Sequence, residues 1–440
     1  MDLADLTATE AARQIRDGKI TSVDLVGSCI NRIKAREDDV RAWQYFDPDH
    51  AMRQAKAADA SIQAGNPPGL LHGLPVGIKD IIATADMPTE DGTPVHKNRQ
   101  PSEDATCVRA LRDAGAVIMG KNVTTELATR HPGKTRNPHN IAHTPGGSSS
   151  GSAAAVACGM VPLALGTQTG GSVARPASFC GIYGLKPTLG MISRTGVTMQ
   201  SHTLDTVGVY GRCVEDLALI GDALSQSDPS DAASFPRART SFAAALSETQ
   251  FPAPKFAFMR TPAWEYAEEA ARSEIEAFVG KLGSRVTRLD DPPAFREIID
   301  AHKCIQHAEN VQHFREIEAR GRELLSQTLR ALLDKAKTIT AGNYLKALGQ
   351  RATMHESFLR SLSGYDAVLC LSSCGPAPHG LSSTGDPVFN GMWTFLGVPT
   401  VTLPLMTCGG LPLGLQMIGA RRDEARLLRA AQWLANSMKG

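Results

Sequence analysis

Two glycine-serine clusters are the residues whose types and spacing are best suited to chemistry. The first cluster, TPGGSSSG, begins at Thr144 and contains Ser148, and the second, TQTGGS, ends at Ser172. Paired glycines let the backbone adopt conformations that expose its amide groups. A serine hydroxyl placed on such a backbone becomes a nucleophile when a base removes its proton. The sequence must therefore supply a base.

Lys79 is the candidate base, because it lies in a short apolar run from Leu74 to Ile82. Burial disfavours the charged ammonium, and a pKa lowered by three units costs about 4 kcal/mol, which is typical of a functional site. The alternative is a core lysine that pairs with Asp80, or one that extends to the surface. The two glycine-serine clusters favour the base.

Short apolar runs that alternate with helical segments indicate the elements that position these residues. Thr7 and either Thr21 or Ser22 are typical N-caps of two opening helices. The runs predict strands between helices, and therefore an α/β fold with a mixed sheet; they are 74–82, 116–119, 161–165, 367–371 and 398–403.

The middle of the chain has a different composition. Residues from about 264 to 362 are mostly helix formers with few strand signals. We therefore expect a core of about 1–224 and 363–440, with a helical cap or insertion over about 225–362.

Composition and charge exclude several classes of partner. The 440 residues contain 46 Lys plus Arg and 45 Asp plus Glu, so no overall field attracts nucleic acid or an anionic membrane. The longest weakly polar stretch, 153–166, is shorter than the roughly 20 residues that span a bilayer. We expect a small neutral substrate, no nucleic acid and no membrane. The oligomeric state stays open, with a homodimer as one alternative.

The cysteines and the N-terminus predict a cytoplasmic protein. Nine cysteines form no CxxC pair, and the first residues lack the basic flank and apolar run of a secretory signal. Cys370 and Cys374 have no second pair at ligand spacing, so no metal site is expected.

Five sequence blocks together resemble the amidase signature family, from the first helix to about Leu434. They occur in the family's order and spacing: GLPVGIKD around Lys79, DATCVRALRDAGAVIMGK over 104–121, TPGGSSSGSAAA from Thr144, TQTGGS ending at Ser172, and GLQMIG from Gly414. The resemblance implies one α/β/α domain over residues 1–440, with helices covering a central mixed sheet. It also implies that no cofactor is needed.

The resemblance further implies a Ser-Ser-Lys triad. Ser172 is then the nucleophile, Lys79 the base, and Ser148, on a cis peptide bond, passes the proton between them. An acyl-enzyme forms on Ser172. Four backbone amides are expected to receive the oxyanion, those of Thr169, Gly170, Gly171 and Ser172.

Two positions depart from the family pattern. The family usually has Asp where this chain has Gln168, and Arg two residues after the nucleophile where it has Ala174. If those residues normally form an ion pair, both have been lost together, and Arg175 is available to bond elsewhere. These departures indicate a divergent branch.

Three competing motifs are disfavoured. The GSSSG sequence around Ser149 fits a nucleophile elbow, but no strand precedes it. Gly115–Lys121 fits GxxxxGK, yet its AVIM is typical of a buried strand and Asn122 replaces the required Ser or Thr. His139 and His143 are flanked by prolines, which argue against a helix that presents both to a metal.

Three further residues are candidates for the substrate pocket. Arg130 and His131 lead towards the first serine cluster, although exposed loop residues would look the same. Trp393 is a candidate apolar wall, and equally a core aromatic.

These features predict a serine hydrolase that cleaves carbon–nitrogen bonds of amides, anilides or carbamates. One alternative is the glutaminase subunit of a transamidation complex, against which the altered residues around Ser172 argue. A binding protein that has lost catalysis is disfavoured, because Lys79, Ser148 and Ser172 are all present.

Overall fold

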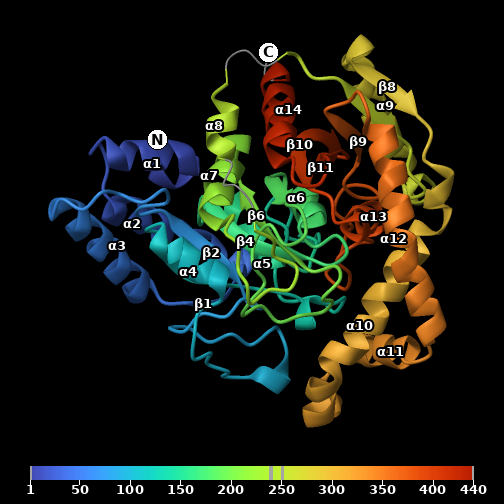
Figure 1. Cartoon of the computed structure of the whole chain (residues 1–440). Helices are drawn as coiled ribbons and strands as arrows, with labels where there is room; N and C mark the ends of the chain where they lie inside the picture. Colours follow the sequence, from blue (N-terminus) through green and yellow to red (C-terminus); the bar gives the residue numbers. More distant parts are fainter. Residues whose placement is uncertain (1, 237–240, 249–251, 439–440) are drawn as a thin grey trace.

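An eleven-stranded sheet runs through the centre of the computed structural model, which describes residues 2–236, 241–248 and 252–438 (Figure 1). The strand order is β1-β3-β2-β4-β6-β5-β10-β11-β9-β7-β8. The strands are β1 Trp43–Phe46, β2 Pro75–Lys79, β3 Val117–Asn122, β4 Leu163–Gln168, β5 Tyr183–Lys186, β6 Thr206–Gly211, β7 Phe256–Met259, β8 Val286–Leu289, β9 Ala367–Leu371, β10 Thr400–Cys408 and β11 Leu411–Ile418.

The sheet is mixed, which confirms the predicted α/β class. Strands β3, β2 and β4 pair in parallel, as do β9, β7 and β8, and the remaining neighbours are antiparallel. The five predicted apolar runs all contribute to strands, namely β2, β3, β4, β9 and β10.

Fourteen α-helices surround the sheet in the described part of the chain. Thr7 and Thr21 cap the first two, as expected, each through its side-chain oxygen. The helices are α1 Ala8–Arg16, α2 Ser22–Val40, α3 Pro48–Gln63, α4 Thr106–Asp113, α5 Ser150–Ala157, α6 Ala174–Cys180, α7 Val214–Leu224, α8 Phe242–Leu246, α9 Glu269–Lys281, α10 Ile298–Gly321, α11 Gln327–Ala336, α12 Ala341–Leu362, α13 Val388–Leu396 and α14 Glu424–Ser437.

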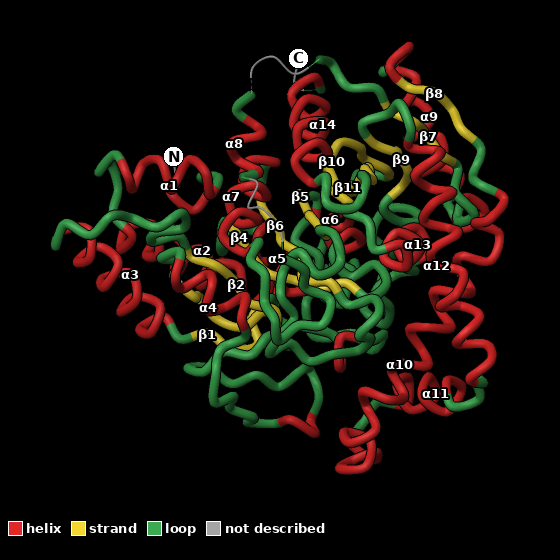
Figure 2. Tube along the Cα trace, in the orientation of Figure 1, coloured by secondary structure: helices red, strands yellow, loops and turns green. Residues whose placement is uncertain are grey.

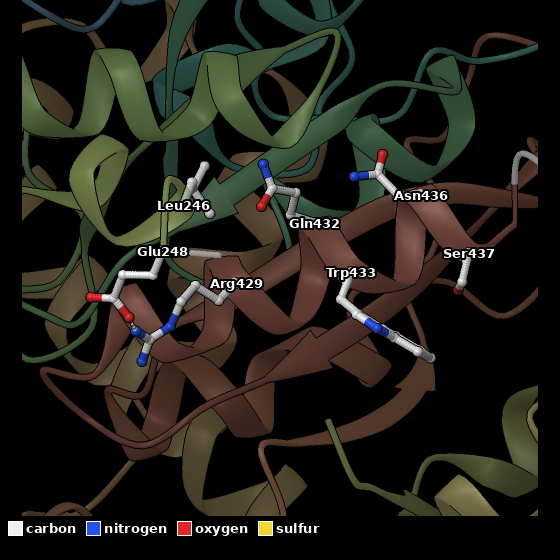
Figure 3. Close-up of a pocket in the computed structure, with 7 residues that line it drawn as sticks. All are labelled: Leu246, Glu248, Arg429, Gln432, Trp433, Asn436 and Ser437. Atoms are coloured by element: carbon white, nitrogen blue, oxygen red, sulfur yellow. Dashed lines mark hydrogen bonds and ion pairs between the residues drawn. The ribbon is translucent and has the colours of Figure 1, made fainter. Parts of the chain in front are cut away.

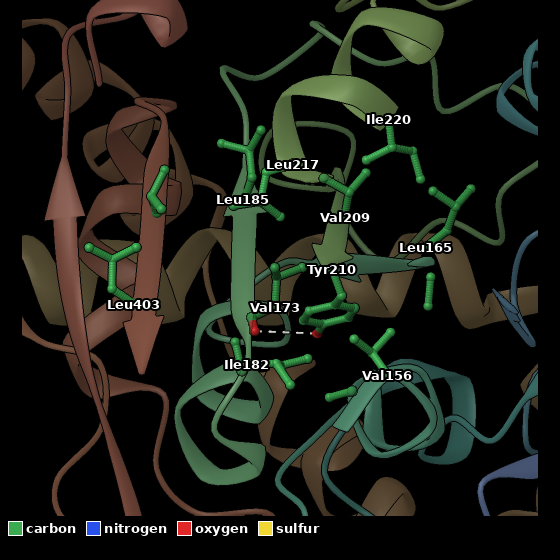
Figure 4. Close-up of a cluster of buried hydrophobic side chains, with 14 of the residues drawn as sticks. Val156, Leu165, Val173, Ile182, Leu185, Val209, Tyr210, Leu217, Ile220 and Leu403 are labelled. Carbon is green, nitrogen blue, oxygen red and sulfur yellow. Dashed lines mark hydrogen bonds between the residues drawn. The ribbon is translucent and has the colours of Figure 1, made fainter. Parts of the chain in front are cut away.

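Helices cover both faces of the sheet, as two neighbouring residues of β5 demonstrate. A Cβ added to Gly184 would lie 2.9 Å from Ala177 Cβ in α6, whereas the side chain of Leu185 extends to Gly221 in α7. Because successive strand residues point to opposite faces, α6 and α7 lie on opposite sides. Figure 4 shows the apolar side chains that fill both layers.

The region expected to be a helical cap is not purely helical. Its strands β7 and β8 extend the central sheet beyond β9, so this part of the segment belongs to the sheet. Each is only four residues long, which is too short for a clear alternating pattern. Helices α10 and α12 pack against α13, and α11 packs against α10, at one side of the molecule (Figures 1 and 2).

Almost the whole described chain shares one apolar core. A second, smaller cluster joins Leu127 to apolar residues of α10 and α11. None of the described helices is both long enough and apolar enough to cross a membrane.

Candidate active site

The ends of two neighbouring parallel strands form the floor of the site. Lys79 is the last residue of β2, and Thr167 and Gln168 are the last two residues of β4. Parallel strands place their carboxyl ends at the same edge of a sheet, where α/β proteins commonly bind ligands. The register pairs Ile78 with Leu165, so Lys79 and Thr167 both lie at this edge and are joined by a hydrogen bond.

Lys79 is fully buried, and its partners in the described part of the chain are two hydroxyl groups. Its Nζ lies 2.7 Å from Ser148 Oγ and 2.8 Å from Thr167 Oγ1. Burial lowers the pKa of Lys79 well below its usual value, and the charge of Asp205 opposes this shift. Among the described residues no carboxylate forms an ion pair with Lys79, because Asp80 pairs with Lys121 instead, at 3.2 Å. This arrangement favours the neutral amine that a base requires.

Ser148 lies on a tight loop before α5. The peptide bond between Gly147 and Ser148 is cis, as the resemblance implied. The carbonyl of Gly147 accepts a hydrogen bond from Arg175 Nη2 at 2.7 Å, which fixes the plane of that peptide group. The neighbouring Ser149 has a structural role, since its Oγ donates to Thr167 O and accepts from Thr167 N.

Ser172 lies at the end of a loop, residues 169–172, in which two carbonyl groups bond to side chains of other elements. His302 Nε2 bonds to Thr169 O at 2.9 Å, and Thr394 Oγ1 donates to Gly170 O at 3.0 Å. In contrast, the amide groups of residues 169–172 donate to no acceptor in the described part of the chain. Buried amides without acceptors are rare, and four in succession can bind an oxyanion.

Gly171 is required for close packing beneath this loop. A Cβ added there would lie 2.3 Å from Asn390 Oδ1 of α13. Asn390 is fixed by Gln416 of β11, at 3.2 Å, and by the carbonyl of Ser372. Gln416 belongs to the GLQMIG block, so this block affects the Ser172 loop through Asn390.

The two departures from the family pattern have a clear structural outcome. Gln168 Oε1 accepts hydrogen bonds from the amides of Val173 and Ala174, and its Nε2 donates to Thr394 Oγ1. Gln168 therefore caps the start of α6 without a charge. Arg175 bonds elsewhere, to the carbonyls of Gly147 and Thr384.

A narrow pocket opens beside Ser172. Its lining includes Ser172, Gly170, Gly171, Arg130 and Arg175. Arg130, one of the three candidate pocket residues, thus lies in this lining.

The other two predicted pocket residues lie elsewhere. His131 is exposed and is not among the residues that line the pocket. Trp393 is fully buried and packs against Phe295 and Phe358, so it is a core aromatic.

Sequence reasoning missed the helix that forms the opposite wall. Gln306, His307 and Asn310 of α10 line the pocket, and His302 of the same helix supports the Ser172 loop. His302, Gln306 and Asn310 recur at intervals of four residues, which places them on one helix face. This polar stripe was the available signal.

The competing motifs have structural roles. Lys121, the last residue of the GxxxxGK match, lies in β3 and pairs with Asp80. His139 and His143 bond to the backbone carbonyls of Cys180 and Ala377. No group of three or more His, Cys, Asp or Glu within the described ranges could hold a metal ion.

A larger hollow lies between α8 and α14 (Figure 3). It shares no lining residue with the pocket at Ser172. Its volume is about 380 Å³, against about 40 Å³ for the pocket at Ser172. Glu248 and Arg429 pair across it, and Ser437, the one serine among its described lining residues, donates to a helix carbonyl. Its described lining residues include no nucleophile beside a base, so size alone does not mark the active site.

Comparison with known proteins agrees with this geometry. A family model described as Amidase matches residues 24–428. The chain belongs to the amidase family. It is thus an amidase-family hydrolase that acts on carbon–nitrogen bonds.

Similar proteins within this amidase family include both amidotransferase components and amidases. The A component of glutamyl-tRNA(Gln) amidotransferase from Agathobacter rectalis is 32% identical, with 98% of this chain and 93% of the relative covered. The same component from Chloroflexus aurantiacus is 33% identical, with coverages of 97% and 96%.

Solved amidase-family structures match the whole chain. The peptide amidase of Stenotrophomonas maltophilia is 28% identical, with a TM-score of 0.85 and coverages of 99% and 98%. A protein from "an unexpected vestigial protein complex" linked to an s-triazine catabolic enzyme is 26% identical, with a TM-score of 0.91 and coverages of 98% on both sides.

Proposed function

We propose that this chain is a serine amidase that cleaves small amides, anilides or carbamates through an acyl-enzyme on Ser172. The contact between Lys79 Nζ and Ser148 Oγ, at 2.7 Å in a fully buried setting, carries the proposal. A buried lysine without a carboxylate partner has a large energetic penalty as an ammonium, and its neutral form can accept a proton.

In this mechanism Ser172 attacks the substrate carbonyl while its proton passes through Ser148 to Lys79. The free amides of residues 169–172 stabilise the negative charge that develops on the carbonyl oxygen. The proton then returns along the same path to the departing nitrogen, because an unprotonated amine leaves poorly. Water finally attacks the acyl-enzyme, which releases the acid and restores Ser172.

The narrow pocket supports a small substrate. Its volume of about 40 Å³ is far below the several hundred Å³ that hold a drug-sized ligand. A short acyl group fits this limit better than a long chain or a peptide.

The first test compares hydrolysis of a nitroanilide, a simple aliphatic amide, glutamine and an aryl carbamate. Ser172→Ala is expected to lower kcat by at least about 10⁴-fold, and Ser148→Ala by at least about 10²-fold. Ser102→Ala, at an exposed position, is the matched control and leaves kcat unchanged. Activity that survives Ser172→Ala would remove this serine from the mechanism.

A second candidate function is the glutaminase component of a tRNA-dependent amidotransferase. It is favoured by the amidotransferase components that are 32% and 33% identical over nearly their whole length. Under this alternative the chain copurifies with a partner protein and hydrolyses glutamine only in its presence. Turnover of a simple amide by the isolated chain argues for the first candidate.

A further inference from the structure

A buried carboxylate lies next to the strand ends that carry the site. Asp205 directly precedes β6, whose Thr206 pairs with Gln168 in the antiparallel register with β4. The next step of that register places Asp205 opposite Thr169, and Thr169 Oγ1 donates to Asp205 Oδ1 at 2.5 Å. Asp205 is buried, and none of the ion pairs among the described residues includes it. Its charge is therefore not cancelled by a direct partner.

Three donors hold Asp205 in its charged form. Besides the hydroxyl of Thr169, the backbone amides of Gln200 and Ser201 donate to Asp205 Oδ2 at 2.7 and 3.1 Å. Burial raises the pKa of Asp205, and these hydrogen bonds and the charge of Arg194 oppose that shift. Donors on both oxygens are the pattern of a carboxylate, so Asp205 is a negative charge inside the fold.

A small cavity relates Asp205 to the base. Thr167, whose Oγ1 lies 2.8 Å from Lys79 Nζ, lines this cavity together with Asp205 and Thr169. Its volume of about 10 Å³ is close to the smallest space that holds one water. Charges separated by so little solvent are weakly screened. The negative charge of Asp205 accordingly raises the pKa of Lys79, against the larger effect of burial.

The other charged groups around Lys79 and Asp205 have partners of their own. Three ion pairs hold them: Lys121–Asp80 at 3.2 Å, Arg194–Asp231 at 2.6 Å and His202–Glu309 at 3.3 Å. His302, which bonds to Thr169 O, is uncharged near neutral pH because burial lowers its pKa to about 4. Asp205 is thus the negative charge through which the fold acts on Lys79.

We propose that Asp205 acts through Lys79 as a positioning residue, whose carboxylate is the counter-charge for the ammonium that forms during catalysis. This proposal rests on the proposed function, in which Lys79 accepts a proton. In that step the Ser172 oxygen bonds to the carbonyl carbon, its proton passes to Ser148, and the proton of Ser148 passes to Lys79. Because no carboxylate touches Lys79, the resting amine stays neutral. Because Asp205 lies close by, the ammonium is less costly when it forms.

The test follows the reaction of Ser172 with methanesulfonyl fluoride, which requires no knowledge of the substrate. The Ser172 oxygen attacks sulfur, fluoride leaves, and the proton reaches Lys79 through Ser148. Intact-mass spectrometry then gives the rate constant for labelling from pH 5 to 9.5. This rate constant reports the base-assisted step on its own.

Asp205→Asn removes the charge but keeps the shape, since an amide can accept from two backbone N–H groups and donate to Thr169. Without the counter-charge the pKa of Lys79 falls further, so Lys79 becomes a weaker base that stays neutral at lower pH. We expect the ratio of the wild-type to the Asp205→Asn rate constant to be about three- to tenfold at pH 9.5 and to approach one at low pH. A ratio that is equal at every pH would overturn the proposal.

Asp216→Asn is the matched control. Asp216 of α7 is also a buried carboxylate, and it accepts from the amides of Thr9 and Arg212 and from the hydroxyl of Thr9. These partners lie outside the site, so the ratio of wild type to Asp216→Asn should not vary with pH. Circular dichroism checks that each variant is folded before labelling.

Asp205→Ala provides a second variant, in which the removed carboxylate leaves space beside the small cavity. Formate placed there restores a negative charge. Labelling of Asp205→Ala at pH 9 should be about threefold faster or more in sodium formate than in sodium chloride of equal ionic strength. Formate that does no better than chloride would contradict the counter-charge role.

Hydrolysis of the amide panel separates this proposal from the proposed function. Amide turnover that is lost in Ser172→Ala, together with an Asp205→Asn ratio that does not vary with pH, would contradict the role of Asp205 alone. Labelling at Ser172 that depends on Asp205 as described, without turnover of any amide, anilide or carbamate, would contradict the proposed substrates while the role of Asp205 stands. Wild-type protein that is not labelled at Ser172 would contradict both.

Discussion

Asp80 and Lys121 form a buried ion pair, with Lys121 Nζ 3.2 Å from Asp80 Oδ1. Asp80 directly follows Lys79 in the sequence, yet it pairs with a lysine on the neighbouring strand β3. Lys79 is consequently left with two hydroxyl partners, Ser148 and Thr167. The same region thus holds one lysine as a charged structural group and the other in conditions that favour a neutral base.

Asp80→Asn should destabilise the fold strongly, because it leaves the Lys121 ammonium buried without its counter-charge. We expect a loss of about 3–5 kcal/mol in the free energy of unfolding, measured with urea at pH 7. Asp80→Asn combined with Lys121→Met should recover part of that loss. The control is Asp17→Asn, which removes an exposed pair with Lys19 and should change stability by less than about 1 kcal/mol. Equal effects of the two single variants would show that the Asp80–Lys121 pair is not ionised.

Lys79→Met should change how stability depends on pH. Burial holds the pKa of Lys79 well below its usual value of 10.5, so below pH 10.5 the unfolded chain binds a proton that the folded chain has released. Wild-type stability therefore rises with pH between the lowered pKa and about 10.5, by up to about 1.4 kcal/mol per pH unit from this group. The Met variant lacks that contribution.

The measurement for Lys79 is a set of urea unfolding curves from pH 7 to 10. The difference in free energy of unfolding between Lys79→Met and wild type should shrink as pH rises. Lys56→Met, at an exposed site, should follow wild type throughout. Parallel curves for wild type and Lys79→Met would mean that Lys79 is charged in the folded protein.

Gln168→Met should damage catalysis by releasing the loop before Ser172. The substitution removes the acceptor for the amides of Val173 and Ala174 and the donor to Thr394. Each unsatisfied buried group costs about 1–3 kcal/mol, and the oxyanion amides lose their fixed direction. We expect kcat to fall by at least about tenfold with a smaller change in KM. Gln226→Met, at an exposed position, should leave both constants unchanged, and an equal loss there would refute this role.

The sequence predicted the parts of the site that depend on local pattern. Lys79 stands out as a charge in an apolar run, and Ser148 and Ser172 follow paired glycines whose backbone freedom the site uses. The apolar runs that contain these strands were also predicted, whereas the parallel pairing of β2 with β4 was found only in the structure. The predicted features are visible within ten residues of the chain.

The parts that were missed depend on long-range contacts. His302 contacts Thr169, which is 133 positions away in the chain, and Asn390 lies next to Gly171 while it bonds to Gln416 and to the carbonyl of Ser372. The polar stripe of His302, Gln306 and Asn310 marks one helix face, but nothing local shows which part of the fold that face contacts. Trp393 is the opposite case. Its sequence context made it a candidate wall of the pocket, but it lies wholly in the core.

His302 should make the folded protein sensitive to acid. Burial lowers its pKa from 6.5 to about 4, although its bond to Thr169 O opposes the shift, so at neutral pH the ring is uncharged and Nε2 carries the donated hydrogen. Between pH 6.5 and 4 the unfolded chain binds a proton that the folded chain does not. The stability is therefore fully present above about pH 6.5 and is lost as pH falls, by up to about 1.4 kcal/mol per pH unit from this residue.

His302→Gln removes this titration while an amide N–H can still donate to Thr169 O. Urea unfolding from pH 8 to 4.5 should show a shallower acid limb for His302→Gln than for wild type, with His379→Gln, an exposed histidine, matching wild type. Half-buried His307, whose pKa is also lowered to about 4 by burial, keeps part of the slope in every variant. If His302→Gln retained the full wild-type slope, His302 would take up its proton at the same pH in the folded and unfolded chain. Its ring would then present a positive charge beneath the oxyanion loop, and catalysis rather than stability would depend on its protonation.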